Sequence, residues 1–159
     1  MTATVLAPPT FYKGYLLDSS VVSALAPGRE AYLPSIFGDW LQAHEAQLFL
    51  PAIAVAELAQ GIGKLHRSGG MERAQGLDRW LDGLIAGFAD RILPLDARAA
   101  RLAGQISDAA VAQGRHPGFA DVAIAALAQN ANLLLLTRNL KHFKPLGVNC
   151  VDPLTQLPA

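Results

Sequence analysis

Short apolar runs alternate with longer amphipathic stretches along this chain. The runs have the length of β-strands and lie at residues 15–17, 48–50, 91–93 and 133–136, with a weaker run at 148–151. Each of the first four is followed by a polar or proline-bearing turn and then by a helical pattern. Strands that alternate with helices predict a parallel sheet. The run 133–136 is four leucines without polar alternation, which is typical of a central strand covered on both faces.

Between these runs, apolar residues recur at helical spacing. One stripe contains Val55, Leu58, Ala59 and Ile62, and a second contains Ala99, Leu102, Ala103, Ile106 and Ala110. Residues 122–128 are apolar on nearly every side, so this helix should be buried. Gly69 and Gly70 divide a helical hairpin that spans about residues 52–88. Asp96 precedes the second stripe, where its carboxylate is expected to cap the helix.

The composition indicates one globular domain. The chain has 159 residues, of which 52% are hydrophobic and 16% charged. A single cysteine, Cys150, excludes an internal disulfide and fits a reducing cytoplasm. No signal-like N-terminal segment and no apolar run of about 18 residues is present, so we expect a cytoplasmic protein without a membrane span.

The charges balance, with 13 basic and 13 acidic residues, so any site for a polyanion must be local. No acidic residue lies between Asp121 and Asp152, whereas Arg138, Lys141, His142 and Lys144 gather there. These residues form either a cationic patch that contacts phosphate groups or an ordinary solvated surface.

Three polar residues are notable because they follow predicted strands. In a parallel α/β sheet, ligands bind beyond the carboxyl ends of the strands. Asp18 follows the first apolar run, and Thr137 and Asn139 follow the run 133–136. Two strand ends are therefore expected to meet at one site.

Two more carboxylates, Glu57 and Asp121, lie in apolar helical segments. A buried carboxylate costs several kcal/mol unless it is paired or bound to a metal. Taken singly, Asp121 has an alternative role in the first turn of a helix, and Glu57 is one polar position on an apolar helix. Taken together with Asp18, they are the hard oxygen ligands that Mg²⁺ or Mn²⁺ uses to hydrolyse phosphodiesters.

Four segments resemble, in order, the conserved blocks of the PIN-domain family. They are LDSSVV at 17–22, PAIAVAEL at 51–58, ADVAIAALA at 120–128 and LTRNLKHF at 136–143. The similarity runs from about residue 15 to residue 153 and is closest to the VapC-type toxins, including the FitB branch. This leaves residues 1–14 as an expected flexible extension and residues 154–159 as a C-terminal tail.

The resemblance implies a three-layer α/β/α fold around a central parallel sheet. It also implies metal-dependent cleavage of RNA, with Mg²⁺ or Mn²⁺ held by Asp18, Glu57 and Asp121, a VapB-like antitoxin that blocks the site, and a homodimer. Asn139 and His142 stand where many members have an aspartate, so the number of metal ions stays open. Asn139 can still take part in catalysis as a neutral oxygen ligand or by binding a metal-held water, although it contributes no charge. Ser19, Thr137, Arg138 and Lys141 are candidate contacts to metal-bound water or phosphate, although Ser19 and Thr137 could equally cap turns.

Competing functions differ in what they require. The missing fourth carboxylate also fits a PIN fold that binds or regulates without catalysis. A phosphoacceptor domain would need several acids after the first strand, where only Asp18 is present, and a nucleotide-binding enzyme would need a glycine-rich phosphate loop. The hairpin 52–88, with the segment around Trp40, is expected to offer an antitoxin an apolar groove.

Overall fold

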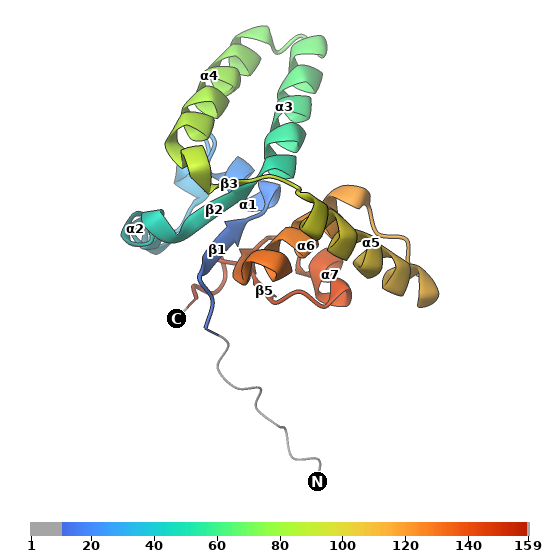
Figure 1. Cartoon of the computed structure of the whole chain (residues 1–159). Helices are drawn as coiled ribbons and strands as arrows, with labels where there is room; N and C mark the ends of the chain where they lie inside the picture. The colour runs from blue at the N-terminus through green and yellow to red at the C-terminus, as the bar shows by residue number, and fades with distance from the viewer. Residues whose placement is uncertain (1–10, 159) are drawn as a thin grey trace.

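The computed structural model describes residues 11–158 and is built on a parallel sheet (Figure 1). The strands are β1 (Gly14–Leu17), β2 (Leu48–Pro51), β3 (Ile92–Leu93), β4 (Leu133–Leu136) and β5 (Cys150–Val151). Their order in the five-stranded sheet is β3-β2-β1-β4-β5, so the chain winds outwards twice from the central strand β1. All neighbouring strands are parallel. The prediction of an α/β fold with a parallel sheet is confirmed.

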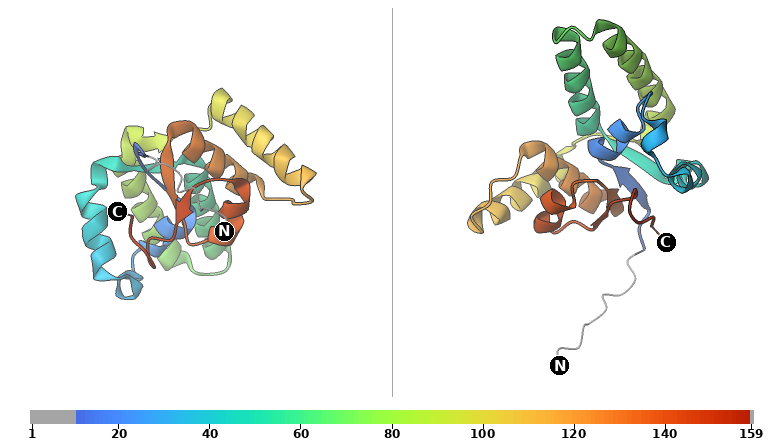
Figure 2. Two further views of the ribbon diagram at one scale, coloured as in Figure 1. Left: turned by 90° about the horizontal axis from the view of Figure 1, so that it is seen from below. Right: turned by 180° about the vertical axis from the view of Figure 1, so that it is seen from behind.

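The helices divide into two layers because successive side chains of a strand point to opposite faces. Leu16 and Leu135 pack in one hydrophobic cluster with α5 (Ala97–Ala112), α6 (Phe119–Ala131) and α7 (Leu140–Phe143). Leu17 and Leu136 pack in the other cluster with α1 (Ser19–Ala24), α2 (Ser35–Ala43), α3 (Ala52–Arg67) and α4 (Met71–Phe88). The result is the expected three-layer α/β/α arrangement, which Figure 2 shows from two further sides.

Four short 3-10 helices complete the secondary structure of the described residues. They are η1 (Glu30–Tyr32), η2 (Glu45–Gln47), η3 (Ala89–Arg91) and η4 (Lys144–Leu146). Three of them lead directly or closely into strands β2, β3 and β5. Gly14, the first residue of β1, has no room for a side chain. A Cβ atom there would collide with the carbonyl oxygen of Gln47, the residue before β2.

The helical predictions hold with small shifts at their ends. The hairpin forms as α3 and α4, and Gly69 takes the left-handed conformation (φ 94°) at the turn between them. Helix α6 is buried from Val122 to Ala128, as its composition predicts. Asp96 caps α5, where its side chain accepts a hydrogen bond of 2.9 Å from the backbone N–H of Ala99.

The ends of the domain are only partly described. The predicted extension 1–14 falls mostly on residues outside the described part, and β1 already begins at Gly14. Within the predicted tail, Leu154 and Leu157 pack against the cluster on the α1–α4 side of the sheet. The proposed boundaries at residues 14 and 153 stay predictions.

Helices α3 and α4 stand out from the body of the domain as a hairpin (Figures 1 and 2). Below it, Trp40 of α2 is buried, with its ring centroid 4.8 Å from that of Tyr15 and stacked at 4.3 Å on His44. Trp40 therefore belongs to the core and not to an open groove.

Across residues 11–158, no helix is both long enough and apolar enough to span a bilayer.

Candidate active site

Asp18 lies at the carboxyl end of β1, where the strand passes into α1. Its side chain is only 2% exposed, and it is held by hydrogen bonds from neighbouring groups. Oδ1 accepts from the backbone N–H of Ser19 at 2.8 Å, and Oδ2 accepts from the hydroxyl of Ser20 at 2.7 Å. Asp18 is the N-cap of α1, so the start of this helix fixes the carboxylate at the edge of the sheet.

Thr137 reaches Asp18 because of the strand register. Strands β1 and β4 are paired with Leu17 opposite Leu136, so the residues that follow them, Asp18 and Thr137, are also neighbours. The fully buried Thr137 donates a hydrogen bond of 2.8 Å to Asp18 Oδ2. Its oxygen also accepts a bond of 3.0 Å from the backbone N–H of Asn139. The two strand ends meet at one point, as the sequence predicts.

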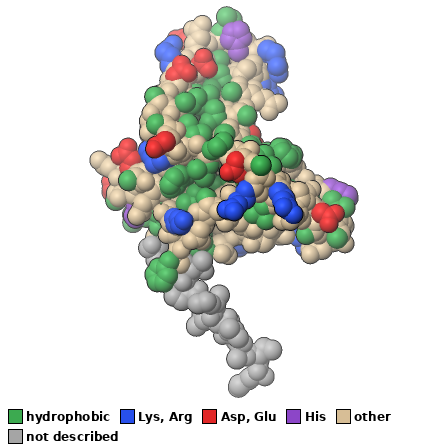
Figure 3. All heavy atoms as spheres, viewed as in Figure 1, with side chains coloured by type: hydrophobic (Ala, Val, Ile, Leu, Met, Phe, Trp, Pro, Cys, Tyr) green, Lys and Arg blue, Asp and Glu red, His purple; other side chains and the backbone are tan. Residues whose placement is uncertain are grey.

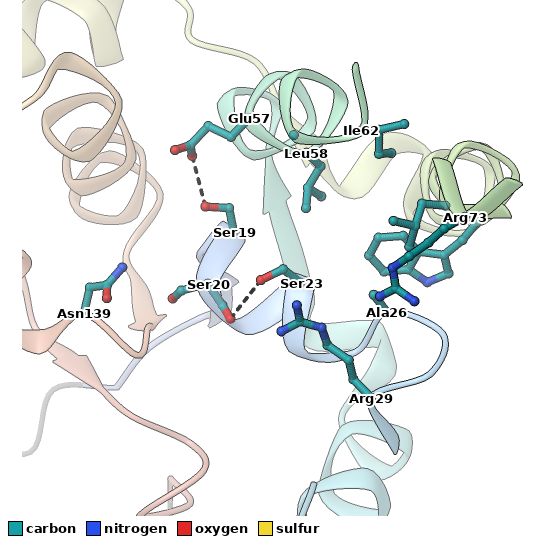
Figure 4. Close-up of a pocket in the computed structure, with 13 residues that line it drawn as sticks. Ser19, Ser20, Ser23, Ala26, Arg29, Glu57, Leu58, Ile62, Arg73 and Asn139 are labelled. Atoms are coloured by element: carbon teal, nitrogen blue, oxygen red, sulfur yellow. Dashed lines mark hydrogen bonds between the residues drawn. The ribbon is translucent and has the colours of Figure 1, made fainter. Parts of the chain in front are cut away.

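Glu57 projects from the second turn of α3 towards α1. It accepts a hydrogen bond of 3.1 Å from the hydroxyl of Ser19, drawn as a dashed line in Figure 4. The same hydroxyl lies 3.5 Å from Asp18 Oδ1. The hydroxyl of Ser19 thus lies between the two carboxylates. The sequence alone left open whether Ser19 contributes to the site or only caps a turn.

Asp121 lies in the first turn of α6 and has a partner that no sequence pattern indicated. Nδ1 of His142, on α7, is 3.3 Å from Oδ2 of Asp121, with the two side chains 50% and 29% exposed. His142 is one of the two positions at which many family members carry an acid. In this chain the position provides a group that can pair with Asp121 when it is protonated.

The three carboxylates influence one another electrostatically. Burial raises the pKa of Glu57, the hydrogen bond from Ser19 lowers it, and the charges of Asp18 and Asp121 raise it further. Burial also raises the pKa of Asp121, as does the charge of Asp18, whereas His142 acts in the opposite direction. Raised pKa values mean that the ionised forms are unfavourable in this cluster, which a bound cation would relieve.

An open groove of about 450 Å³ runs from this cluster between α1 and the hairpin. Ser19, Glu57 and Asn139 line one end of it, and Leu58, Ile62 and Trp80 contribute apolar walls (Figure 4). Asp18 is buried beneath this end, and Asp121 is not among the lining residues. The structure thus brings Asp18, Glu57, Asp121 and Asn139 to one region. Of these four, Glu57 and Asn139 line the groove.

These side chains do not form a complete set of direct ligands for one metal ion. Among residues 11–158, no three acidic, histidine or cysteine side chains are gathered closely enough to hold one ion directly. The carboxylates are close enough to repel one another but too far apart for all three to bind one ion directly. A metal ion at this site would therefore keep water molecules in part of its coordination shell.

The basic residues near the fourth block separate in the structure. Arg138 lines a cavity together with Arg29 and Arg73, whereas Lys144 lines a different one beside Cys150. Lys141 is exposed on α7 and is not among the residues that line the groove. The basic residues of the predicted cationic patch therefore do not line one common cavity, and the patch itself stays a prediction. Arg29 and Arg73 could not be found from the sequence because no motif connects them to the site.

Comparison with known proteins supplies the family. The sequence profile described as "PIN domain" matches residues 15–146, which is most of the chain. The chain belongs to the PIN domain family. Its PIN fold also agrees with solved structures: the crystal structure of FitAcB from Neisseria gonorrhoeae superposes with a TM-score of 0.73 at 31% identity, covering 87% of this chain and 97% of that one.

Individual relatives within the PIN family are similar over nearly their whole length. VapC ribonuclease Y4jK of Sinorhizobium fredii is 30% identical over 141 residues, covering 87% of this chain and 96% of the relative. Toxin FitB of Neisseria gonorrhoeae is 32% identical over 143 residues, with the same coverage. The structure of FitAB bound to IR36 DNA matches with a TM-score of 0.67 at 29% identity, covering 91% of this chain and 98% of that one. The resemblance to VapC and FitB toxins is confirmed.

Proposed function

We propose that this PIN protein is a divalent-metal-dependent endoribonuclease that acts as the toxin of a toxin–antitoxin pair in the cytoplasm. The observation that carries the proposal is the meeting of Asp18, Glu57 and Asp121 from three separate elements beside an open groove, with raised pKa values for Glu57 and Asp121. Clusters of this kind are unfavourable without a cation and are common at functional sites. Relatives named ribonuclease and toxin support the assignment.

The donor set fits Mg²⁺ or Mn²⁺ in its chemistry. Oδ2 of Asp18 is occupied by the hydroxyls of Ser20 and Thr137, whereas Oδ1 accepts only one short bond, from the backbone of Ser19. Oδ1 therefore has a lone pair available. Since Mg²⁺ usually retains several waters and uses one or two protein carboxylates, the wide spacing of the acids is compatible with it. Asp18, Glu57 and Asp121 would hold the ion, which when bound supplies an activated water and neutralises charge on the phosphate.

The protein's own groups have distinct tasks in the hydrolysis. Thr137, Ser20 and the backbone of Ser19 fix the orientation of Asp18, so this carboxylate needs no rearrangement. In the reaction a water oxygen bonds to phosphorus, the bond to the leaving ribose oxygen breaks, the proton of the attacking water passes to a base, and the leaving oxygen takes up a proton from solvent. Glu57 is placed to accept that proton, because its carboxylate lines the groove and lies 3.1 Å from the hydroxyl of Ser19.

The contact between His142 and Asp121 favours a second candidate, a PIN fold that binds without cleaving. A protonated His142 would neutralise Asp121 in place of a metal, and Asn139 adds no charge. Incubation of RNA with Mg²⁺ or Mn²⁺, with and without a chelator, separates the two candidates. Cleavage that needs the metal supports the ribonuclease, and metal binding that stays undetectable by calorimetry together with intact RNA supports the binding module.

An antitoxin partner and a homodimer belong to the same proposal. Hydrophobic side chains gather over the hairpin on the face shown in Figure 3. On the α2 side of the hairpin lies a cavity of about 330 Å³. Its lining includes the apolar side chains of Leu41, Leu84 and Phe88, together with Gly83 and Gly87, which have no side chain. This surface would accept an apolar segment of a small antitoxin. Co-expression with the small protein encoded upstream should recover a stable complex, and light scattering of the purified chain should give the mass of a dimer.

A further inference from the structure

Three arginine side chains from distant parts of the sequence reach one cavity next to the carboxylates. Arg29 comes from the loop after α1, Arg73 from the first turn of α4, and Arg138 from the loop after β4. All three line a cavity of about 430 Å³. Arg29 and Arg73 also line the groove that contains Glu57, and Figure 4 shows both side chains extending into that groove. The two spaces are therefore adjoining parts of one surface depression.

These arginines have no acidic partner in the described part of the chain. The one ion pair within residues 11–158 joins His142 to Asp121, and none of the three guanidinium groups donates a hydrogen bond to another residue there. Glu30, the first residue of η1, forms no ion pair with these arginines, and its carboxylate accepts a bond of 2.9 Å from the backbone N–H of Gly28. Three arginines therefore line one cavity without an ion pair among residues 11–158, an arrangement that favours binding of an anion.

The backbone around Arg29 brings the arginines together. Gly28 adopts the left-handed conformation (φ +88°), and a Cβ atom built on it would lie 3.6 Å from Nη1 of Arg73. The guanidinium of Arg73 therefore lies against the loop that carries Arg29. Arg138 is fixed from the other side, since its backbone N–H donates a bond of 3.0 Å to the hydroxyl of Ser20, which also holds Asp18. The cationic cavity is thus connected to the carboxylate cluster through a single serine.

Tyr32 adds an aromatic surface to this cavity. It is 83% exposed, although it lines the same cavity as the arginines. An exposed ring beside cationic groups is the arrangement with which proteins bind single-stranded nucleic acid, because bases stack on the ring while arginines contact phosphates.

We propose that Arg29, Arg73 and Arg138, with Tyr32, form a subsite for the phosphodiester backbone of single-stranded RNA. We call it the arginine pocket. It holds the strand on the α1 side of the carboxylates, so that a phosphate farther along the chain lies over Glu57 and Asp18. This inference rests on the proposed ribonuclease function. It explains how a chain of zero net charge attracts RNA, because the positive charge is concentrated beside the acidic cluster.

The test measures binding without cleavage. A fluorescent single-stranded RNA is titrated with the full chain in the presence of a chelator, over a series of salt concentrations. For wild type, the slope of log K against log salt reports the number of phosphates contacted, about 0.7 for each on a single strand. We expect Arg29→Ala and Arg73→Ala each to reduce the magnitude of the slope by about 0.7 to 1 and to weaken binding severalfold. Tyr32→Ala should weaken binding while the slope stays unchanged.

Arg79→Ala provides the matched control. It removes the same charge from the same helix, but Arg79 is not among the residues that line either cavity. Thermal melts of every variant establish that it is folded. If the pocket variants bind RNA with the affinity and slope of Arg79→Ala, the arginine pocket is refuted. It is equally refuted if those variants bind RNA normally and lose only a co-expressed protein partner.

Cleavage by the wild type with Mn²⁺ is measured separately, so that the two proposals can fail independently. Reduced slopes in a protein that never cleaves RNA support the arginine pocket and contradict the ribonuclease. Normal cleavage with unchanged slopes supports the ribonuclease and overturns the pocket.

Discussion

Thr137→Val is the substitution that most directly tests how Asp18 is held. Valine has nearly the shape of threonine, so the fully buried site is not emptied, but the hydroxyl is lost. Asp18 Oδ2 then loses a donor at 2.8 Å, and the backbone N–H of Asn139 loses its acceptor at 3.0 Å. A hydrogen bond to a charged group contributes about 1.5 to 3 kcal/mol and a neutral one about 1 kcal/mol. We therefore expect the free energy of unfolding to fall by about 2 to 4 kcal/mol.

Thr137→Ser is the control because it keeps the hydroxyl and removes only a methyl group. It should cost about 1 kcal/mol or less, since one buried methyl contributes roughly that amount. Urea denaturation at pH 7 of the metal-free protein measures both variants, and cleavage assays should show a greater loss for valine than for serine. A valine variant that is within about 0.5 kcal/mol of the serine variant would refute the anchoring of Asp18 by Thr137.

Other substitutions test the charges and caps around the site. Asp121→Asn should stabilise the metal-free protein at pH 7, because it removes a carboxylate whose pKa is raised by burial and by Asp18. The folded protein binds the proton of Asp121 more tightly than the unfolded chain does, so this advantage should disappear as the pH of thermal melts falls through the folded pKa to below about 4. Asn139→Asp should tighten Mn²⁺ binding in calorimetry if that position contacts the ion or its waters, and unchanged affinity would exclude the contact. Asp96→Ala should cost about 1 kcal/mol in urea denaturation and Asp96→Ser much less, because serine also caps helices.

The sheet and the contact between Asp18 and Thr137 could be predicted because both depend on local patterns. Apolar runs of strand length located β1, β2 and β4, and the parallel order brought the residues after β1 and β4 to one edge. Helix α2 was not predicted, although Phe37, Trp40 and Leu41 have helical spacing and pack in the core. In this case the aromatic residues could be interpreted as packing helices or as forming a partner interface, and the helix itself was not recognised.

Contacts between residues far apart in the sequence could not be predicted from patterns. The pair of His142 and Asp121 depends on how α7 packs beside α6, and no spacing rule determines that arrangement. Arg73 meets Arg29 because the hairpin folds back over the loop after α1. Such juxtapositions follow from tertiary packing, which explains why the sequence assigned the cationic patch to residues 138–144 alone.

The assignment of Asp121 to a metal-dependent active site can be tested in one experiment. Purified wild-type protein and Asp121→Asn are incubated with single-stranded RNA and Mn²⁺, with and without a chelator, after melts have shown that both are folded. We predict cleavage by the wild type with Mn²⁺ only, and no cleavage by the variant under either condition. Cleavage that persists both in the presence of chelator and in Asp121→Asn would contradict a metal-dependent site at this carboxylate cluster.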